Sequence, residues 1–599
     1  MEQCLEFSPH LSKFTLLQKY LWLHNMDKKQ VAEILDEIAD LLELKGEVEF
    51  KVRTYRNASR IIREVKGDLK ELVNSGELAK IKGIGPNLFE KIKELVNTGQ
   101  LRYYEDLKKS IPEGLFELLQ IPGLGPRRIK TIYEKLGITT IAELEYACRE
   151  NRLLKLDGFG KTIQEKVLRE IEKLKQTAEY HLLSFAFPVV KVVEDFINSN
   201  LNVINFTITG SWRRKKELIR DIDVVLNVKE KDFKNTAEVI RKKFPHIKVI
   251  ASNYNFVSLV SEFGMNVDFI LADEDYAFKV FYTTGSKEFL NKIGEYILKL
   301  GFRLSDEGIF KNGEKLKFLN EEQIFNKFGM SFIPPELREG LDEIELALKG
   351  EIPNLIGEKD LIGVFHIHST YSDGSDTLED MIAECEKLGF KFVGIADHSK
   401  SAYYAGGLTE DRLEQQWREI DELQKKFKIK ILKGSEVDIL PDGSLDYSND
   451  ILSKFDFVIA SIHSKFKMTE EEATQRIIKA MNNPYVTIIG HPTGRLLLGR
   501  DGYPVNMKKI IDEASKLGVV IEFNANPHRL DIDWRFINYA RSKGVKISIN
   551  PDAHAVSEIY YTILSLGTAR KGMLTKDDVL NSMSVEQVQN FLKAHRKKN

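Results

Sequence analysis

The stretch HIHSTYSDG, residues 366–374, places His366, His368 and Asp373 close together, directly after an apolar segment. Short apolar segments that alternate with helical patterns are typical of parallel strands joined by helices. The alternation predicts a parallel barrel or sheet with functional side chains at the carboxyl ends of its strands. The further apolar segments are FVGIADH (392–398), FDFVIASIH (455–463), VTIIGHP (486–492), VVIEFNA (519–525) and VKISINPDAH (545–554).

Histidines collect at these strand ends. Seven of the twelve histidines lie between residues 366 and 554, and six of the seven end or follow an apolar strand. One such histidine would more often be structural than a metal ligand, but six accompanied by Asp373, Glu436 and Asp552 favour a metal centre. Mixed imidazole and carboxylate ligands suit Mn²⁺, Zn²⁺ or Fe²⁺ rather than Ca²⁺. Such ions activate water for phosphoester hydrolysis.

The order of these residues, HxH…D…DH…E…H…GHP…DxH, resembles the PHP (polymerase and histidinol phosphatase) domain. The resemblance implies a distorted (β/α)7 barrel with a trinuclear centre that holds Mn²⁺, Zn²⁺ or iron. His528 lies outside the pattern, and we expect it to be structural or to contact a phosphate. The ligands implied by the resemblance are His366, His368, Asp373, His398, Glu436, His463, His491, Asp552 and His554.

A second motif, GSWRRKKELIRDIDVV, occupies residues 210–225. In a strand, residues i and i+2 share a face about 6.6 Å apart, so Asp221 and Asp223 should point the same way. Paired carboxylates beside a core resist ionisation unless a cation intervenes, and two Mg²⁺ ions held in this way catalyse nucleotidyl transfer. Asp268, in the later strand segment NVDFIL, is the candidate for a third carboxylate.

The residues before this Asp pair strengthen the functional interpretation. An Asp-x-Asp pair alone is common on solvated strand ends. Here it follows GS-x-RR, in which Ser211 and Arg214 can bind phosphate oxygens and Gly210 lets the backbone come close. The combination predicts a nucleotide-binding site.

One helical motif occurs three times: IKGIGPNLFEKI (81–92), IPGLGPRRIKTI (121–132) and LDGFGKTIQEKV (156–167). A Gly-x-Gly turn that opens a helix lets backbone N–H groups approach a phosphate, as the Gly83/Gly85 and Gly123/Gly125 pairs should. The repeats resemble helix-hairpin-helix elements, which bind DNA backbones without reading sequence. Charges nearly balance across residues 26–180, so we expect few and backbone-centred contacts.

The combination of GS-x-RR…DID, a later TGS and a helix-hairpin-helix half resembles the family X DNA polymerases, the group of DNA polymerase beta. The resemblance implies that Asp221, Asp223 and Asp268 hold Mg²⁺ or Mn²⁺. It also implies roles in binding dNTPs. Ser211 and Arg214 would hold the triphosphate with Gly210 and Gly285 nearby, and Tyr282 of FYTTGSKEF would lie near the incoming sugar.

Residues 50–62, FKVRTYRNASRII, and the first glycine repeat resemble the lyase-type domain of the same family, which binds the 5′-phosphate of a gap. Lys51 and Tyr55 match its phosphate contacts, and Lys91 matches its Schiff-base lysine. The sequence also departs from the family. Asn87 replaces a phosphate-binding lysine and Phe50 a histidine, so we expect weak lyase activity or none. Thr283 and Leu290 replace a Phe and an Asn, which leaves sugar discrimination open.

The two resemblances span residues 26–580 in the order of the bacterial and archaeal family X polymerases. They imply a multidomain repair enzyme that fills short gaps in gapped or primed DNA and carries a 3′–5′ exonuclease. The expected parts are an extension (1–25), a lyase-like helix-hairpin-helix domain (26–105), fingers (106–180), an α/β nucleotidyltransferase palm (181–275), a thumb (276–345), a linker (346–360) and a PHP nuclease domain (361–590).

Composition limits the alternatives. With 599 residues we expect three to five domains. The net charge of −2 by itself indicates neither a nucleic-acid nor a membrane partner. Cys4, Cys148 and Cys385 lack CxxC spacing, which suits a reducing cytosol, and no apolar run reaches the roughly 18 residues of a membrane span. We expect a cytoplasmic monomer, and we expect residues 1–25 to be an extension upstream of a start at Met26.

Two other functions stay open at this stage. The chain could be a DNA-end-binding scaffold with a degenerate polymerase site, since Thr283 and Leu290 depart from the family pattern, although the intact Asp triad favours activity. It could also be a small-molecule phosphatase, like histidinol phosphatase, fused to a DNA-binding half. Competition between p-nitrophenyl phosphate and primed DNA would separate the second alternative from a nuclease.

Overall fold

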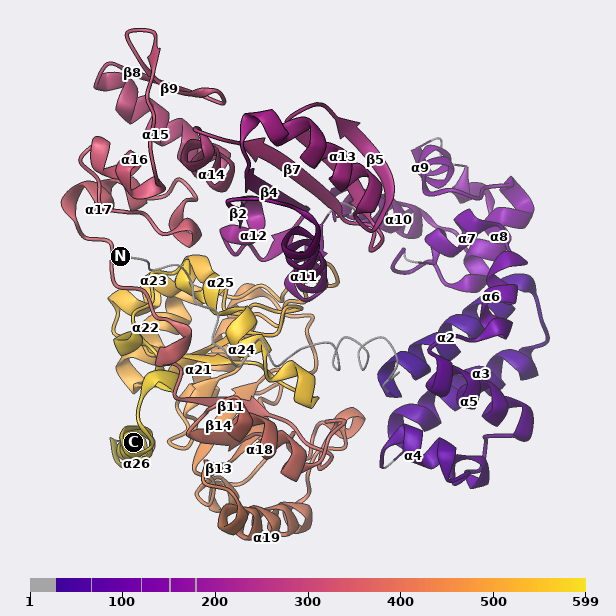
Figure 1. Cartoon of the computed structure of the whole chain (residues 1–599). Helices are drawn as coiled ribbons and strands as arrows, with labels where there is room; N and C mark the ends of the chain where they lie inside the picture. Colours follow the sequence, from indigo (N-terminus) through magenta and orange to yellow (C-terminus); the bar gives the residue numbers. More distant parts are fainter. Residues whose placement is uncertain (1–27, 66, 120, 150–151, 178–179, 599) are drawn as a thin grey trace. The chain divides into compact units, whose positions relative to one another are not determined.

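The computed structural model describes residues 28–65, 67–119, 121–149, 152–177 and 180–598 (Figure 1). The described residues form two compact units, which divide after residue 179. The predicted extension at residues 1–25 and the predicted start at Met26 lie outside the described residues. The multidomain fold class is confirmed, whereas the finer division of the chain stays a prediction.

The first unit is helical throughout its described residues. Its helices form because apolar residues recur at helical spacing, as with Val31, Leu35 and Leu42, which line the buried face of the first helix. Its elements are α2 (Lys28–Lys45), α3 (Glu49–Glu64), α4 (Leu69–Asn74), η2 (Leu78–Lys80), α5 (Pro86–Thr98), α6 (Arg102–Lys109), α7 (Glu113–Leu118), α8 (Pro126–Leu136), α9 (Ile141–Arg149), η3 (Leu153–Lys155) and α10 (Lys161–Thr177).

The glycine repeats are turns that open helices. Gly85 and Gly125 directly precede α5 and α8, each of which begins with a proline. Proline suits this first position because its fixed φ is already helical and its missing N–H needs no partner. Gly83 and Gly123 have φ of 109° and 93°, in the left-handed region that glycine adopts without a steric penalty.

The second unit begins with a five-stranded mixed sheet in the order β2-β4-β7-β6-β5. The sequence segments NFTITGS, DIDVVLNV, FVSLVSEF and NVDFIL predict four of these strands, and β5 was not predicted. Three aromatic rings, Phe196, Phe244 and Phe269, pack edge to face in the core beneath it. The elements are β1 (His181–Leu182), α11 (Leu183–Asn200), β2 (Asn205–Ile208), α12 (Gly210–Arg213), β3 (Leu218–Ile219), β4 (Asp221–Asn227), η4 (Glu230–Asp232), α13 (Phe233–Lys243), β5 (His246–Ser252), β6 (Phe256–Ser261) and β7 (Asn266–Ala272).

A helical region with a small antiparallel sheet follows. It has its own hydrophobic cluster, which includes Phe289, Phe325 and Ile333, and one residue from much later in the chain, Met573. The elements are α14 (Tyr276–Thr284), α15 (Lys287–Lys299), β8 (Phe302–Ser305), β9 (Gly308–Lys311), β10 (Glu314–Lys315), α16 (Glu321–Lys327), η5 (Pro335–Leu337), α17 (Glu343–Lys349) and η6 (Glu358–Asp360).

The rest of the unit is a seven-stranded parallel sheet whose strands follow chain order, β11 to β17. A bridge between Ile367 and Ala553 joins its two edges, so the sheet is nearly closed into the expected barrel. Figure 1 shows this barrel in orange and yellow, with helices around it. The strands are β11 (Gly363–Ile367), β12 (Phe392–Ile395), β13 (Lys430–Asp438), β14 (Phe457–Ser461), β15 (Ile488–Ile489), β16 (Val520–Asn524) and β17 (Ile547–Asn550).

Helices connect and surround these strands. They are η7 (Tyr403–Ala405), α18 (Leu378–Lys387), α19 (Glu410–Lys426), α20 (Asn449–Leu452), α21 (Glu470–Met481), α22 (Met507–Leu517), α23 (Trp534–Ser542), η8 (Val556–Glu558), α24 (Tyr561–Leu564), α25 (Leu566–Arg570), η9 (Lys576–Asp578), η10 (Leu580–Ser582) and α26 (Val585–Lys598). Among the described residues, none of the chain's helices is long and apolar enough to cross a membrane.

The mixed sheet and the barrel share one hydrophobic core. A single cluster of buried side chains runs from α11 and β4 into the barrel strands and helices. Phe187 of α11 packs on Tyr560, just before α24, with ring centroids 5.7 Å apart. The two parts of this unit are therefore joined by packing as well as by the chain.

Candidate active sites

The three carboxylates predicted for nucleotidyl transfer lie on adjacent strands. Asp221 and Asp223 are two residues apart on β4, and Asp223 pairs directly with Asp268 on the parallel strand β7. Ser258 of β6 donates a 2.5 Å hydrogen bond to Asp268 Oδ1. Arg220 contacts Asp221 Oδ2 at 3.0 Å. The register of β4 and β7 brings the predicted triad together, while the catalytic role of its members stays a prediction.

The electrostatics of the triad fit a cation site. Burial, followed by the charges of Asp221 and Asp268, raises the pKa of the Asp223 carboxyl to about 7. Burial also raises the pKa of Asp268, although the hydrogen bond from Ser258 partly offsets it. Grouped carboxylates that resist ionisation are stabilised in their charged form by a divalent cation. Their oxygen ligands match the preference of Mg²⁺ and Mn²⁺.

Gly210 brings the backbone against this triad. Its φ is +61°, and a Cβ at this position would lie 2.0 Å from Asp223 Oδ2, so only glycine fits. The neighbouring Thr209 N–H donates a 2.7 Å hydrogen bond to the Asp223 carbonyl. The Ser211 hydroxyl oxygen is buried and has no hydrogen-bond partner among the described residues. A buried hydroxyl of this kind is a suitable group to receive a ligand.

Arg214 is held by protein groups at the start of the predicted triphosphate site. Its Nη1 donates to the Thr284 carbonyl at 2.7 Å, and its Nε donates to Glu339 Oε1 at 3.3 Å. Thr284 ends α14 and Gly285 follows it, so the predicted contact at Gly285 lies beside Arg214 in the chain's fold. Tyr282, also on α14, packs against Phe278 with ring centroids 5.6 Å apart.

The two departures from the family pattern have ordinary structural surroundings. The Thr283 hydroxyl donates to the Lys279 carbonyl within α14 at 2.7 Å. Leu290 lies close to Gly285, where an added Cβ would come within 3.0 Å of its Cδ2. The consequences of Thr283 and Leu290 for sugar discrimination stay open.

The sequence did not reveal a buried charge network that supports this region. Arg213 donates to both carboxylate oxygens of Glu321, at 3.1 and 2.6 Å, and Arg338 binds the same carboxylate. Burial would raise the pKa of Glu321, but Arg338 and Arg213 lower it to about 2. No local motif marks this network, because Arg213 and Glu321 are 108 positions apart in the chain.

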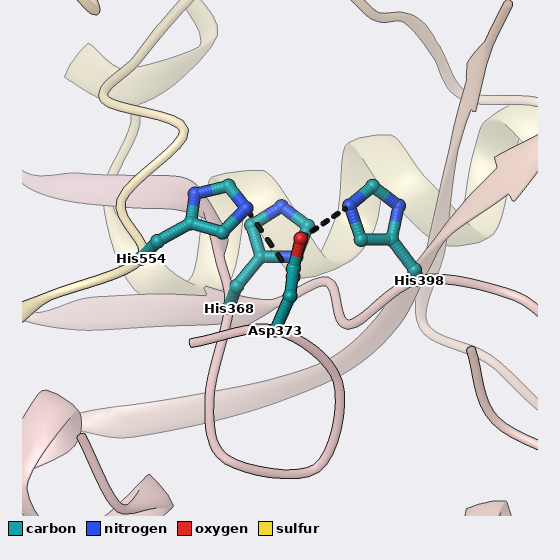
Figure 2. Close-up of side chains that lie close together, drawn as sticks. All are labelled: His368, Asp373, His398 and His554. Atoms are coloured by element: carbon teal, nitrogen blue, oxygen red, sulfur yellow. Dashed lines mark ion pairs between the residues drawn. The ribbon is translucent and has the colours of Figure 1, made fainter. Parts of the chain in front are cut away.

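The second site lies at the carboxyl ends of the barrel strands. Asp373, in the loop after β11, lies 3.5 Å from His398 Nε2 and 3.3 Å from His554 Nε2. Figure 2 shows this carboxylate between the two imidazoles, with His368 beside it. The His368 and His554 rings stack with centroids 4.2 Å apart. Residues that follow β11, β12 and β17 therefore meet at one point.

Ligand atoms of eight of the nine predicted residues form three overlapping groups, within each of which they lie 4.8 Å or less apart. His491 belongs to none of the groups, but its Nε2 lies 2.8 Å from Glu436 Oε1. Because His368, His398 and Glu436 each belong to two groups, the geometry suits neighbouring ions that share ligands. The groups are His368, Asp373, His398 and His554; His366, His368, Glu436 and Asp552; and His398, Glu436 and His463.

The environment of these groups is compatible with metal binding. The buried His366 Nε2 and both His368 ring nitrogens have no hydrogen bond within the part of the chain that the structure describes. Burial alone would lower the pKa of His463, yet Glu436 and Asp438 raise it to about 10. The cluster therefore attracts positive charge, which bound divalent ions would supply while displacing protons.

Backbone strain marks the same place. His366, His491 and Asp552 all have positive φ, of 60°, 24° and 52°. Non-glycine residues in this region cost of order 1–3 kcal/mol each and are most often found at functional sites. Three of the nine predicted ligands thus adopt conformations that the surrounding packing must hold in place.

Groups behind the ligands were not found from the sequence. Glu522 on β16 accepts from the His491 N–H at 2.8 Å and lies 2.6 Å from His366 Nδ1. Asp438 contacts His463 Nδ1 at 2.5 Å. These carboxylates fix the orientation of ligand imidazoles. The acidic residue inside VVIEFNA was the available signal for Glu522. His528 is exposed, and its N–H donates to Asn526, so the structure places it outside the three groups.

In the helical unit, the predicted lyase residues lie close together. Lys91 Nζ donates to the Tyr55 hydroxyl at 2.5 Å and lies 3.5 Å from the Tyr103 ring centroid. Burial, with Lys51 nearby, lowers the pKa of the Lys91 ammonium. A lowered pKa makes a lysine a better nucleophile. Lys51 binds Glu47, and Phe50 is 82% exposed, so the Phe50 side chain is not packed into this group.

Together the fold and the two clusters define a class of protein, an enzyme that joins a nucleotidyltransferase-like sheet to a metal-binding barrel. Four family models match the chain. They are a helix-hairpin-helix domain (residues 26–101), a SAM-like helix-hairpin-helix tandem (115–173), the DNA polymerase beta thumb (279–339) and the PHP domain (365–526).

Known proteins match nearly all of the chain or a smaller share of it. DNA polymerase/3′-5′ exonuclease PolX of Bacillus subtilis strain 168 is 36% identical over 577 residues, which cover 95% of this chain and all of that protein. A probable phosphatase of Thermoanaerobacter sp. strain X514 is 30% identical over 245 residues, 39% of this chain and 95% of its own length. The chain therefore belongs to the family X DNA polymerases that carry a PHP domain.

Proposed function

We propose that this chain is a DNA-directed DNA polymerase that fills short gaps during repair, and that its barrel is a metal-dependent 3′–5′ exonuclease. The observation that carries the polymerase half is the direct pairing of Asp223 with Asp268, beside Asp221 and beneath Gly210. The B. subtilis relative is named for both activities and matches over its whole length.

In the polymerase half, the residues would divide into metal ligands and phosphate ligands. Asp221, Asp223 and Asp268 would hold two Mg²⁺ or Mn²⁺ ions, which supply charge stabilisation for the attacking and leaving oxygens. The buried Ser211 hydroxyl and the Arg214 guanidinium would bind the triphosphate of a dNTP, while Gly210 leaves room for it. Tyr282 and Gly285 would contact the incoming nucleotide from α14.

In the barrel, all nine predicted ligands would hold three ions, with Mn²⁺, Zn²⁺ or iron the matching metals. The bound ions would supply an activated water for phosphodiester hydrolysis at a 3′ end. Glu522 and Asp438 would keep His366 and His463 in the orientation that ligation requires, because each contacts the Nδ1 atom and leaves Nε2 to face the site.

The helical unit would bind DNA by its backbone. The Gly83/Gly85 and Gly123/Gly125 turns present N–H groups at helix starts, where a phosphate is favoured. Lys51 and Tyr55 would contact the 5′-phosphate of a gap, and Lys91 would support weak lyase activity or none. We also propose that the protein is a cytoplasmic monomer and that its substrates are gapped or primed DNA and dNTPs.

One assay tests both halves. A labelled primer with a one-nucleotide gap is incubated with the full chain, dNTPs and Mg²⁺ or Mn²⁺, and the products are separated on a gel. We expect extension by one nucleotide in the presence of dNTPs and shortening of the primer in Mn²⁺ without dNTPs. A primer that stays unchanged under every condition would refute the proposal.

The comparisons do not favour the alternative of a small-molecule phosphatase, although relatives named probable phosphatases match 39% of the chain. It predicts that p-nitrophenyl phosphate is hydrolysed readily and competes with primed DNA. We expect the reverse, with primed DNA degraded efficiently and little inhibition by p-nitrophenyl phosphate.

A further inference from the structure

The loop that carries Arg214 is clamped by residues from the barrel half of the chain. Lys571, which follows α25, donates hydrogen bonds to the Arg214 carbonyl at 3.0 Å and to Glu339 Oε1 at 2.6 Å. Its third bond goes to the Glu336 carbonyl, also at 3.0 Å. The Lys571 side chain is wholly buried, so its ammonium has exchanged water for these three acceptors.

Glu339 links Lys571 to Arg214, the residue predicted to bind the triphosphate. The same oxygen, Oε1, accepts from Lys571 and from Arg214 Nε. Glu339 Oε2 lies 3.7 Å from Lys216, the second residue after Arg214. Without Lys571, this buried carboxylate would depend on Arg214 and Lys216 for compensation, and it would hold the guanidinium more firmly.

The backbone next to Arg214 needs this support. Lys215 has φ of +55°, in the left-handed region, and such a residue keeps its conformation only where its surroundings impose it. Thr568 of α25 donates a 2.9 Å hydrogen bond to the Lys215 carbonyl. Gly567 leaves the space that the Lys215 side chain fills, since a Cβ there would lie 2.3 Å from Lys215 Cγ.

We propose that Lys571 is a positioning residue for nucleotide binding in the polymerase half, although it belongs to the barrel half. It holds the Arg214 carbonyl and shares Glu339 with the Arg214 guanidinium, so it sets where that guanidinium lies and how freely it can bind a triphosphate. This inference rests on the proposed function.

The test compares Lys571→Met with wild type in the full-length chain, using dNTP titrations on a one-nucleotide gap. We expect KM for dNTP to rise about tenfold, with kcat within about twofold, because a buried charged hydrogen bond that supports binding is lost. Degradation of a single-stranded primer in Mn²⁺ should not change. The matched control is Arg570→Gln, which removes contacts to Glu336 and the Ile356 carbonyl in the same interface but none to Arg214.

A second variant, Thr568→Val, provides a test even if Lys571→Met does not fold. It removes only the hydrogen bond to the Lys215 carbonyl. We expect a smaller rise in KM, of about two- to fivefold. Unchanged KM in both variants, or an equal rise in Arg570→Gln, would overturn the inference. If Lys571→Met does not fold, an unchanged KM in Thr568→Val is sufficient to overturn the inference. Absence of synthesis by wild type would instead refute the proposed function.

Discussion

At the scale of single residues, one glycine lies against the predicted polymerase triad. Gly210 has a left-handed φ and lies so close to Asp223 that a methyl group would overlap the carboxylate. Its effect on conformation can be separated from its effect on space, because Gly264 in the turn between β6 and β7 has φ of +80° and open space around it.

We predict that Gly210→Ala lowers DNA synthesis by about 100-fold, since displacing a catalytic group by about 1 Å costs on that order. The control Gly264→Ala should share the conformational cost of about 1–2 kcal/mol but retain synthesis. Thermal melting and gap filling measure the two effects separately. Equal synthesis by the two variants would show that Gly210 serves only the turn.

The carboxylate of Glu321 gives a residue-scale prediction about pH. Arg338 and Arg213 hold its folded-state pKa at about 2, below its ordinary value of 4.5. Its contribution to stability is therefore complete above about pH 4.5 and is lost as the pH falls towards 2. At neutral pH, Glu321→Gln should lower the free energy of unfolding by about 3–5 kcal/mol, because two arginines lose their buried partner.

The measurement is the difference in melting temperature between wild type and Glu321→Gln at successive pH values. We expect this difference to be constant from pH 7 to about 5 and to narrow below that. The exposed neighbour Glu322 provides the control, and Glu322→Gln should melt like wild type throughout. A difference that widens in acid would contradict the assignment.

At the scale of elements, the sequence predicted the barrel well because parallel strands carry local information. Apolar runs that end in histidine or aspartate place their polar groups at one end of a parallel sheet, so ligands far apart in the chain could be grouped. The carboxylate triad was predicted differently, from acidic residues in two strand segments, and the structure places them at the starts of β4 and β7. Strand β5 and the two-residue strands β1 and β3 were not predicted.

Contacts between side chains that share no motif could not be predicted from the sequence. Glu522 stands in a predicted strand, but only the closed barrel brings it to His366. Arg213 and Glu321 meet across 108 positions, and Lys571 and Arg214 across 357. Such pairs depend on how whole elements pack, which no local pattern of apolar and polar residues specifies.

Strand β16 yields a prediction at this scale, since it contributes none of the nine predicted ligands and yet supports two of them. Glu522→Gln should lower Mn²⁺-dependent primer degradation by about 10–100-fold and reduce the metal retained after dialysis, because His366 loses its charged partner. Gap filling should persist. The surface substitution Glu414→Gln on α19 is the control. If Glu522→Gln degrades primers at the wild-type rate, β16 does not support the site.

At the scale of the whole molecule, the second unit combines two metal-compatible sites of different chemistry. One is built from three carboxylates on a mixed sheet, and the other from imidazoles and carboxylates at the end of a barrel. A shared hydrophobic core and the Lys571 hydrogen bonds join the mixed sheet to the barrel. The two sets of predicted ligands have no residue in common. Substitution of ligands should therefore separate the activities better than removal of either part.

We predict that Asp221→Ala/Asp223→Ala abolishes synthesis, because it removes two of the three charges available to hold the nucleotidyl-transfer ions, and spares primer degradation in Mn²⁺. His366→Ala/His368→Ala should do the reverse. His368 belongs to two of the three ligand groups, so its loss weakens both, by more than the 10–100-fold typical of losing a supporting group. Circular dichroism and thermal melting check that each variant is folded. If the folded histidine variant degrades primers at the wild-type rate, the barrel is not the nuclease.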